Sequence, residues 1–199
     1  MKSLHRPDLY AWSAFDAERN VDFNSVLWVR PEGNVAIDPL PLTDHDRAHL
    51  SALGSLAWIV ITNSDHVRAS GALRDATGAK IAGPAAEREH FPIACDRWLS
   101  DGESLAPGLT ALALEGSKTP GELALLLDET TLITGDLVRA HRAGALMRLP
   151  DGKLADAALA GRSIARLASL TKTETVLVGD GWSLFGGGAA ALGALAAAG

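Results

Sequence analysis

Two neighbouring side chains, Asp65 and His66, stand where a predicted strand gives way to a predicted helix. The apolar run at 58–61 (Trp-Ile-Val-Ile) is typical of a buried strand, and residues 67–76 have helical composition. Carboxylate and imidazole groups can both bind a metal ion. A strand end beside a helix N-terminus opens into a crevice with free N–H groups, which favours a ligand site. This junction is therefore the leading candidate for chemistry.

Three further polar side chains also lie in turns that follow predicted strands. These are Lys118 after the strand at 109–115, Asp136 after 131–134, and Asp180 after 175–178. In an α/β sandwich such strand ends can converge on one crevice. We therefore expect all of these side chains, with Asp65 and His66, around a single cleft.

The elements that must position them alternate between strands and helices. The sequence predicts a hairpin, two clear helices, several shorter helices and further strands. The hairpin covers 25–30 and 34–38, and further strands cover 80–82 and 122–127. One clear helix covers 44–53, between Thr43 and Gly54, and the other covers 153–170. A short helix follows His66. This order predicts two sheets enclosed by helices in one α/β domain, residues 1–199.

The order and spacing of these motifs resemble the metallo-β-lactamase superfamily, whose fold is a four-layer αββα sandwich. The segment Ile61-Thr62-Asn63-Ser64-Asp65-His66 is similar to the family's His-x-His-x-Asp-His signature. Four other segments resemble family motifs. They are Asn34 to Asp38, Ser117-Lys118-Thr119-Pro120-Gly121, Thr134-Gly135-Asp136-Leu137 and Val178-Gly179-Asp180-Gly181.

The chain departs from the family at its histidine positions, where it carries Ile61, Asn63, Lys118 and Asp180. An Ile has no donor atom and a protonated Lys has no lone pair, so the resemblance implies that the family's first metal position is empty. It implies that the protein binds at most one divalent ion, which could be Zn, Fe, Mn or Mg. A protein with no bound ion is also compatible with it. Its ligands would be Asp65, His66, Asp136 and Asp180. Lys118 would replace the charge of the missing ion.

The resemblance implies a hydrolase that acts on a small ester, thioester or phosphoester through a metal-activated water. Asp65, Lys118 and Asp136 are then the expected catalytic residues. The alternative is a non-catalytic pseudo-enzyme or ligand-binding protein that keeps the fold. Each residue also has a structural alternative. Asp65 could cap a helix, and Asp136 and Asp180 lie in glycine-containing turns that favour Asp.

A basic segment follows Asp136 and contains Arg139, His141 and Arg142. It could form a rim that recognises an anionic substrate. It could equally be an ordinary solvated loop.

Composition narrows the expected partners. The chain has 18 Lys and Arg against 24 Asp and Glu, a net charge of −6, which argues against nucleic acid. The single cysteine, Cys95, cannot form an internal disulfide and favours a reducing, cytoplasmic location. The sequence shows no signal peptide and no convincing membrane span. We expect a small-molecule ligand, and the sequence indicates no oligomeric state.

Overall fold

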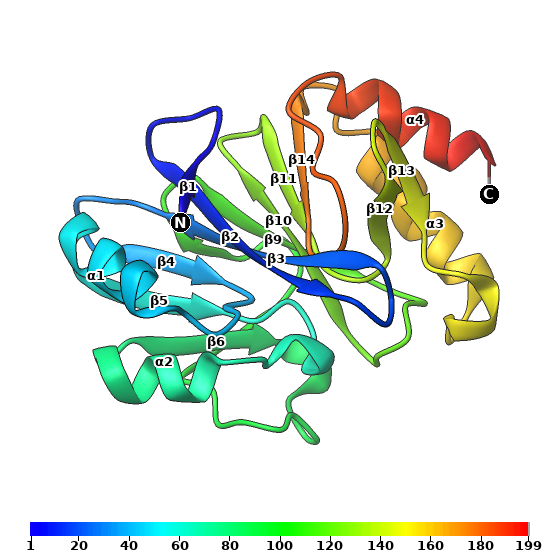
Figure 1. Cartoon of the computed structure of the whole chain (residues 1–199). Coiled ribbons are helices and arrows are strands. Elements are labelled where there is room, and N and C mark those ends of the chain that lie inside the picture. The colour runs from blue at the N-terminus through cyan, green and yellow to red at the C-terminus, as the bar shows by residue number, and fades with distance from the viewer. Residues whose placement is uncertain (199) are drawn as a thin grey trace.

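Two β-sheets packed face to face form the centre of the fold, and helices cover both outer faces (Figure 1). The computed structural model describes residues 1–198. One apolar cluster fills the space between the sheets, and another lies between each sheet and its helices. This layering is the four-layer αββα sandwich that the sequence predicts.

The first sheet has seven strands in chain order. They are β1 (Lys2–Ser3), β2 (Leu9–Asp16), β3 (Val21–Trp28), β4 (Asn34–Ile37), β5 (Leu56–Val60), β6 (Lys80–Pro84) and β7 (Arg97–Leu99). Strands β1 to β4 pair antiparallel, and β4 to β7 pair parallel. The helices α1 (Asp44–Leu53) and α2 (Ser70–Thr77) cover its outer face.

The second sheet has five strands. Their order is β14 (Thr175–Val178), β11 (Thr131–Thr134), β10 (Glu122–Leu127), β9 (Leu109–Leu114) and β8 (Ser104–Ala106). Its outer face packs against α3 (Ala157–Ala168), α4 (Gly188–Ala198) and a hairpin of β12 (Val138–Arg142) and β13 (Ala145–Arg148).

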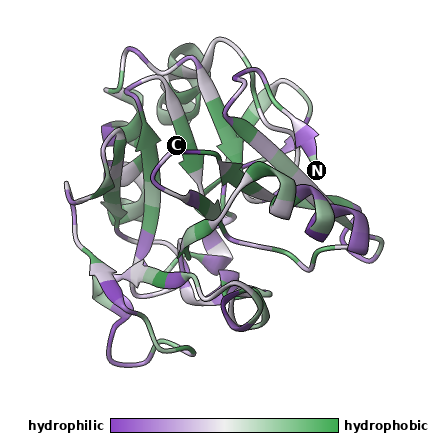
Figure 2. Ribbon diagram, turned by 90° about the vertical axis from the view of Figure 1, so that its left-hand side faces the viewer, coloured by the Kyte–Doolittle hydropathy of each residue, from purple (hydrophilic) through white to green (hydrophobic). Residues whose placement is uncertain are grey.

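Apolar side chains of the two sheets face each other and drive this assembly. Val60 of the first sheet and Leu125 and Leu127 of the second belong to the central cluster and are fully buried. Burying one such side chain contributes roughly 1.5–3 kcal/mol. Figure 2 shows the hydrophobic colour along the central strands and the hydrophilic colour mainly on the loops around them. The apolar core therefore fixes the strands, and the polar turns remain at their ends.

Helix boundaries differ from the sequence prediction at two places. The helix expected directly after His66 begins only at Ser70, because Arg68 adopts a left-handed backbone with φ of 43°. The helix expected from 153 begins at Ala157. Asp156 caps it by accepting hydrogen bonds from two backbone N–H groups. In contrast, α1 has the predicted bounds, with Thr43 as its cap.

Several strands escaped the sequence analysis. The strand β2 is half exposed, so its apolar residues do not alternate cleanly. The β12–β13 hairpin is rich in charged residues, yet Val138 and Ala140 are fully buried against the second sheet. Tertiary packing, rather than local pattern, makes these segments strands.

No helix within residues 1–198 is long and apolar enough to cross a membrane. The cytoplasmic location stays a prediction.

Gly181 offers a test of how the last strand is joined to its neighbours. Its N–H donates to the backbone carbonyl oxygen of Asp22 at 2.8 Å, and its φ is 94°. A Cβ there would lie 2.1 Å from the carbonyl oxygen of Ala140. Gly181→Ala should therefore lower the free energy of unfolding by about 3 kcal/mol in urea titrations. Gly186→Ala, at an exposed position with nothing within 4 Å, is the control and should behave as wild type. Equal stability of the two variants would contradict the expectation.

Candidate functional site

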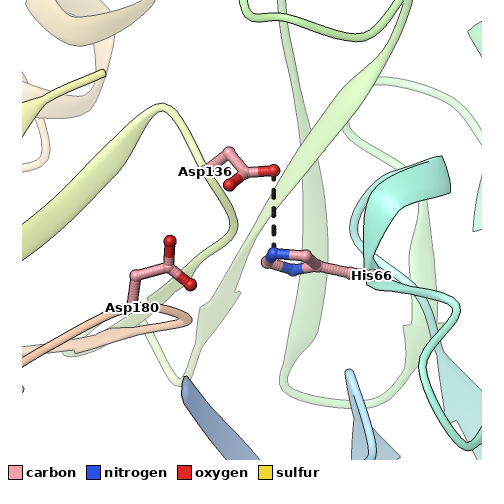
Figure 3. A group of neighbouring side chains, drawn as sticks. All are labelled: His66, Asp136 and Asp180. Carbon is pink, nitrogen blue, oxygen red and sulfur yellow. Dashed lines mark ion pairs between the residues drawn. The ribbon is translucent and has the colours of Figure 1, made fainter. Parts of the chain in front are cut away.

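One cleft of about 840 Å³ is lined by all five side chains that the sequence singles out, Asp65, His66, Lys118, Asp136 and Asp180. Each comes from a turn after a strand. Asp65 and His66 follow β5, Lys118 follows β9, Asp136 follows β11, and Asp180 follows β14. Figure 3 shows His66, Asp136 and Asp180 gathered around one point. The sandwich thus brings together strand ends from both sheets.

The turn that carries Asp65 and His66 is a single 3-10 turn, Ser64–His66. The side chain of Asn63 caps it by accepting a hydrogen bond from the N–H of Asp65 at 3.0 Å. The helix that follows has no side-chain cap. The alternative in which Asp65 acts as the helix cap is therefore wrong, because Asn63 caps the 3-10 turn and Ala69 stands at the N-cap of α2.

Asp38 orients the imidazole of His66, a role that the sequence analysis missed. His66 Nδ1 lies 2.8 Å from Asp38 Oδ2. The same carboxylate accepts hydrogen bonds from the N–H and hydroxyl of Thr62, at 2.8 and 2.6 Å. This leaves Nε2 directed at Asp136, 3.6 Å from its Oδ2 (Figure 3). The sequence signal that could have pointed to Asp38 was the predicted strand at 34–38, which ends in Ile-Asp.

The two carboxylates set the protonation state of His66. Burial disfavours a charged imidazole, but the charge of Asp38 and the hydrogen bond to Asp136 outweigh it and raise the pKa of His66 to about 10. At neutral pH the ring is therefore an imidazolium, and both ring nitrogens carry protons. In this state Nε2 has no lone pair to offer.

Asp136 is the most heavily paired carboxylate of the cleft. Its Oδ1 lies 3.0 Å from Arg139 Nη2, and its Oδ2 lies 3.0 Å from Lys118 Nζ. Asn63 Nδ2 donates to the same Oδ2 at 3.1 Å. Burial would raise the pKa of Asp136, but His66 and Lys118 hold it well below its usual range.

Arg139 links Asp136 to Asp180. Its Nη2 also lies 3.1 Å from Asp180 Oδ2, so one nitrogen stands between two buried carboxylates. Of the predicted basic rim, Arg139 is buried inside the site and His141 lines the cleft. Arg142 is exposed and is not part of the cleft lining. The segment is therefore neither a uniform rim nor an ordinary solvated loop.

Asp180 carries one atom without a hydrogen bond. Its Oδ1 is buried and has no hydrogen-bond partner within the described chain, and Arg68 Nη2 lies 3.7 Å away. Arg68 itself is held by the carbonyl oxygens of Asn24 and Asp38, at 2.6 and 3.1 Å. No sequence pattern marks Arg68, because its partners are backbone atoms distant in the chain.

Lys118 points into the cleft, as the sequence predicts. Its Nζ lies 2.7 Å from Asp65 Oδ2 as well as 3.0 Å from Asp136 Oδ2. Burial would lower the pKa of Lys118, but these two carboxylates raise it. The Asp65 side chain is 54% exposed. It therefore lies at the edge of the site rather than among the buried carboxylates.

The positions where the family has its first two histidines have structural roles here. Ile61 is fully buried in the apolar cluster under α1 and α2. Asn63 caps the 3-10 turn and donates to Asp136, as described above. Ile61 has no donor atom, and the Asn63 side chain is already engaged in these two hydrogen bonds. The empty first metal position stays a prediction.

Glu122 is a further buried acid that the sequence analysis missed, because it looks like an ordinary strand residue. It accepts hydrogen bonds from Ser117 Oγ at 2.5 Å and from the N–H of Leu137 at 2.9 Å. It thereby ties together the turns that carry Lys118 and Asp136. Burial and the charge of Asp136 raise the pKa of Glu122 to about 7.

His66, Asp136 and Asp180 form a group that could hold a metal ion, with one donor atom from each lying within 4.8 Å of the others. The unpartnered Oδ1 of Asp180 supports such a site. The other carboxylate oxygens already have partners, since Arg139 pairs with Asp136 Oδ1 and Asp180 Oδ2 and Lys118 pairs with Asp136 Oδ2. In this arrangement a metal ion and the side-chain cations would compensate the same carboxylates.

Comparison with known proteins identifies the family. The sequence profile of the metallo-beta-lactamase superfamily matches residues 1–199. The structure is similar to the DIM-1 metallo-beta-lactamase, with a TM-score of 0.76, 15% identity, and coverage of 99% of this chain and 96% of that chain. No curated protein matches the sequence.

Two other solved structures are also similar to this chain. ETHE1 from Myxococcus xanthus has a TM-score of 0.67 and 23% identity, covering 87% of this chain and 76% of that chain. The metallo-beta-lactamase FIM-1 from Pseudomonas aeruginosa, solved in its mono-zinc form, has a TM-score of 0.71 and 14% identity, covering 96% and 90%. The chain belongs to the metallo-beta-lactamase superfamily.

Replacing Lys118 tests whether its ammonium stabilises the buried carboxylates. Lys118→Ala removes one of the cations that compensate Asp136 and should lower the free energy of unfolding by about 1–2 kcal/mol in urea. Lys172→Ala is the matched control, because its ion pair with Glu129 is exposed. That control should unfold like wild type. A Lys118→Ala protein as stable as the control would show that the ammonium is not needed.

The raised pKa of Glu122 predicts that the free energy of unfolding falls as the pH rises toward 7. Because its pKa rises from 4.5 to about 7 on folding, its stabilising contribution is full below pH 4.5 and is lost as the pH rises through 7. Glu122→Gln removes this titration. Between about pH 5 and pH 8, the free energy of unfolding of the variant should rise by about 2–3 kcal/mol relative to that of the wild type. Urea titrations at several pH values measure this difference. Parallel pH profiles would contradict a perturbed Glu122.

Proposed function

We propose that this chain is a ligand-binding member of the superfamily in which side-chain cations replace the metal ions. The observation that carries this proposal is the position of Arg139. Its Nη2 lies 3.0 Å from Asp136 Oδ1 and 3.1 Å from Asp180 Oδ2, so a side-chain cation already compensates one oxygen of each carboxylate. The cleft then serves to bind a small molecule, and its volume is in the range of small-molecule sites.

The formal charges of the site support the proposal. Among the side chains of the site that are joined by ion pairs, four acids and four cations balance without any ion. The acids are Asp38, Asp65, Asp136 and Asp180, and the cations are His66, Arg68, Lys118 and Arg139. A divalent ion added to this group would leave an uncompensated charge of +2 in a largely buried site. Such a charge is costly where water is excluded.

A single-metal hydrolase is the second candidate, favoured by the convergence of His66, Asp136 and Asp180 and by the unpartnered oxygen of Asp180. The mono-zinc form of FIM-1 shows that a similar fold can hold one zinc ion. This candidate requires His66 to lose a proton, because a protonated ring nitrogen has no lone pair for a metal ion. Asp65, Lys118 and Asp136 would then keep their expected catalytic roles, toward a small ester, thioester or phosphoester.

Replacing Arg139 separates the two candidates. Arg139→Gln leaves Asp136 and Asp180 without their shared cation and should lower the free energy of unfolding by about 3 kcal/mol. Adding Zn²⁺ or Mn²⁺ should then restore part of this stability, because the ion can take the vacated place. The same ions should not shift the melting temperature of the wild-type protein. Thermal melts of chelator-treated proteins with and without each ion provide the measurement.

Two control variants, one on the same strand and one in the same site, accompany this experiment. Arg142→Gln, exposed on β12, should melt as wild type and should not respond to metal. Adding Asp180→Asn to Arg139→Gln should abolish the metal response by removing a ligand. One tightly bound ion in the wild-type protein would favour the single-metal hydrolase. Two bound ions would contradict both candidates.

A further inference from the structure

The lining of the cleft carries an excess of positive charge, although the chain as a whole carries −6. Five Lys and Arg side chains line it against three Asp. They are Arg19, Arg68, Lys118, Arg139 and Lys153 against Asp65, Asp136 and Asp180. The charge of His66 is not needed for this excess, since Asp38 lies behind it and cancels it. A concave surface of one sign concentrates ligands of the opposite sign.

The excess is located at the outer part of the cleft, because the inner charges are already paired. Asp65, Asp136 and Asp180 all have cationic partners within the site. Arg19 is different. Its side chain is 72% exposed, and its carboxylate partner Asp16 lies 3.9 Å away. This weak, solvated contact leaves the guanidinium available to a ligand.

Lys153 is the second available cation. Within residues 1–198 it makes no ion pair, and it lies in the 3-10 turn Asp151–Lys153 ahead of α3. Arg19 comes from the turn between β2 and β3, in the first sheet. Two segments far apart in the sequence therefore supply cations to one cleft, on the same side of the molecule (Figure 1).

An apolar wall lies beside these cations. Val21, Phe23 and Leu40 line the same cleft, and Phe23 is the partly exposed one of the three. The guanidinium carbons of Arg19 and Arg68 lie 5.6 and 5.7 Å from the centre of the Phe23 ring. Such cation–π contacts hold a guanidinium near the ring while its N–H groups stay free to donate. The cleft thus combines cations with a surface suited to a small apolar group.

We propose that the cleft binds a small organic phosphate monoester, with the phosphate between Arg19 and Lys153 and the organic group against Phe23. Two excess positive charges match the dianion of a phosphate monoester, and arginine and lysine are its usual partners. This proposal rests on the proposed function, since it assumes that the inner carboxylates keep their side-chain cations.

Phenyl phosphate is a suitable probe, because it combines a phosphate dianion with one aromatic ring. Titration calorimetry on the chelator-treated wild-type protein should show one site that binds phenyl phosphate at least about 10-fold more tightly than benzyl alcohol, and more tightly than benzoate. The affinity should fall between about 50 mM and about 500 mM NaCl, because the contacts are exposed. Equal binding of the neutral alcohol or of the monoanion would overturn the charge argument.

Paired variants place the phosphate within the cleft. The double variant Arg19→Gln, Lys153→Gln should weaken phenyl phosphate binding about 10-fold. The matched double variant Arg142→Gln, Lys172→Gln removes the same charges outside the cleft and should stay within about twofold of wild type. Equal losses in both would show unspecific attraction and overturn the proposal.

The chelator separates this proposal from the proposed function. Phenyl phosphate binding that persists in chelator supports the anion site, whatever the metal titrations show. Binding that appears only after a divalent ion is added would overturn it, and would at the same time favour the single-metal candidate. If the wild-type protein takes up neither metal nor phenyl phosphate, the anion proposal fails while the replacement of metal by side-chain cations stands.

Discussion

Buried carboxylates require a compensating positive charge, and here one guanidinium supplies it to two of them. Arg139 bridges Asp136 and Asp180 in a site where both acids are almost fully buried. Without a cation the two acids would repel each other or take up protons. The arginine is bound to the turn of Asp136 through its own Nε as well, at 3.1 Å from the backbone carbonyl oxygen. The local backbone therefore depends on the same interaction.

Around this pair the fold builds a second layer of positioning contacts. Asp38 fixes the ring of His66, and Glu122 holds together the turns of Lys118 and Asp136. Neither acid belongs to the predicted ligand set, and both are buried. Their common role is to fix the geometry of groups that come from different strands. Such support is typical of sites that need fixed geometry, whether the group bound is an ion or a side-chain cation.

Membership of the superfamily fixes the fold and leaves the chemistry to the site. In this chain the site keeps metal-competent donors and also carries cations that neutralise them. The same donors can therefore serve either a binding cleft or a single-metal centre, depending on whether side-chain cations or an ion compensate their charge.

The sequence by itself determined the layered fold and the five side chains that meet in the cleft. It could do so because apolar strands must be buried and polar turns must lie at their ends, so Asp65, His66, Lys118, Asp136 and Asp180 follow strands whose ends converge. Local pattern also fixed α1, where a threonine cap marks the start.

Only the tertiary structure decided what these side chains do together. From the sequence Arg139 belonged either to a basic rim or to a solvated loop, and Asp38, Arg68 and Glu122 had no assigned role. The pairing of Arg139 with Asp180 joins β12 to the turn after β14, and Arg68 contacts backbone atoms of distant segments. Such contacts depend on three-dimensional distance, which charge or spacing along the chain does not encode. The charge balance of the site follows from those distances.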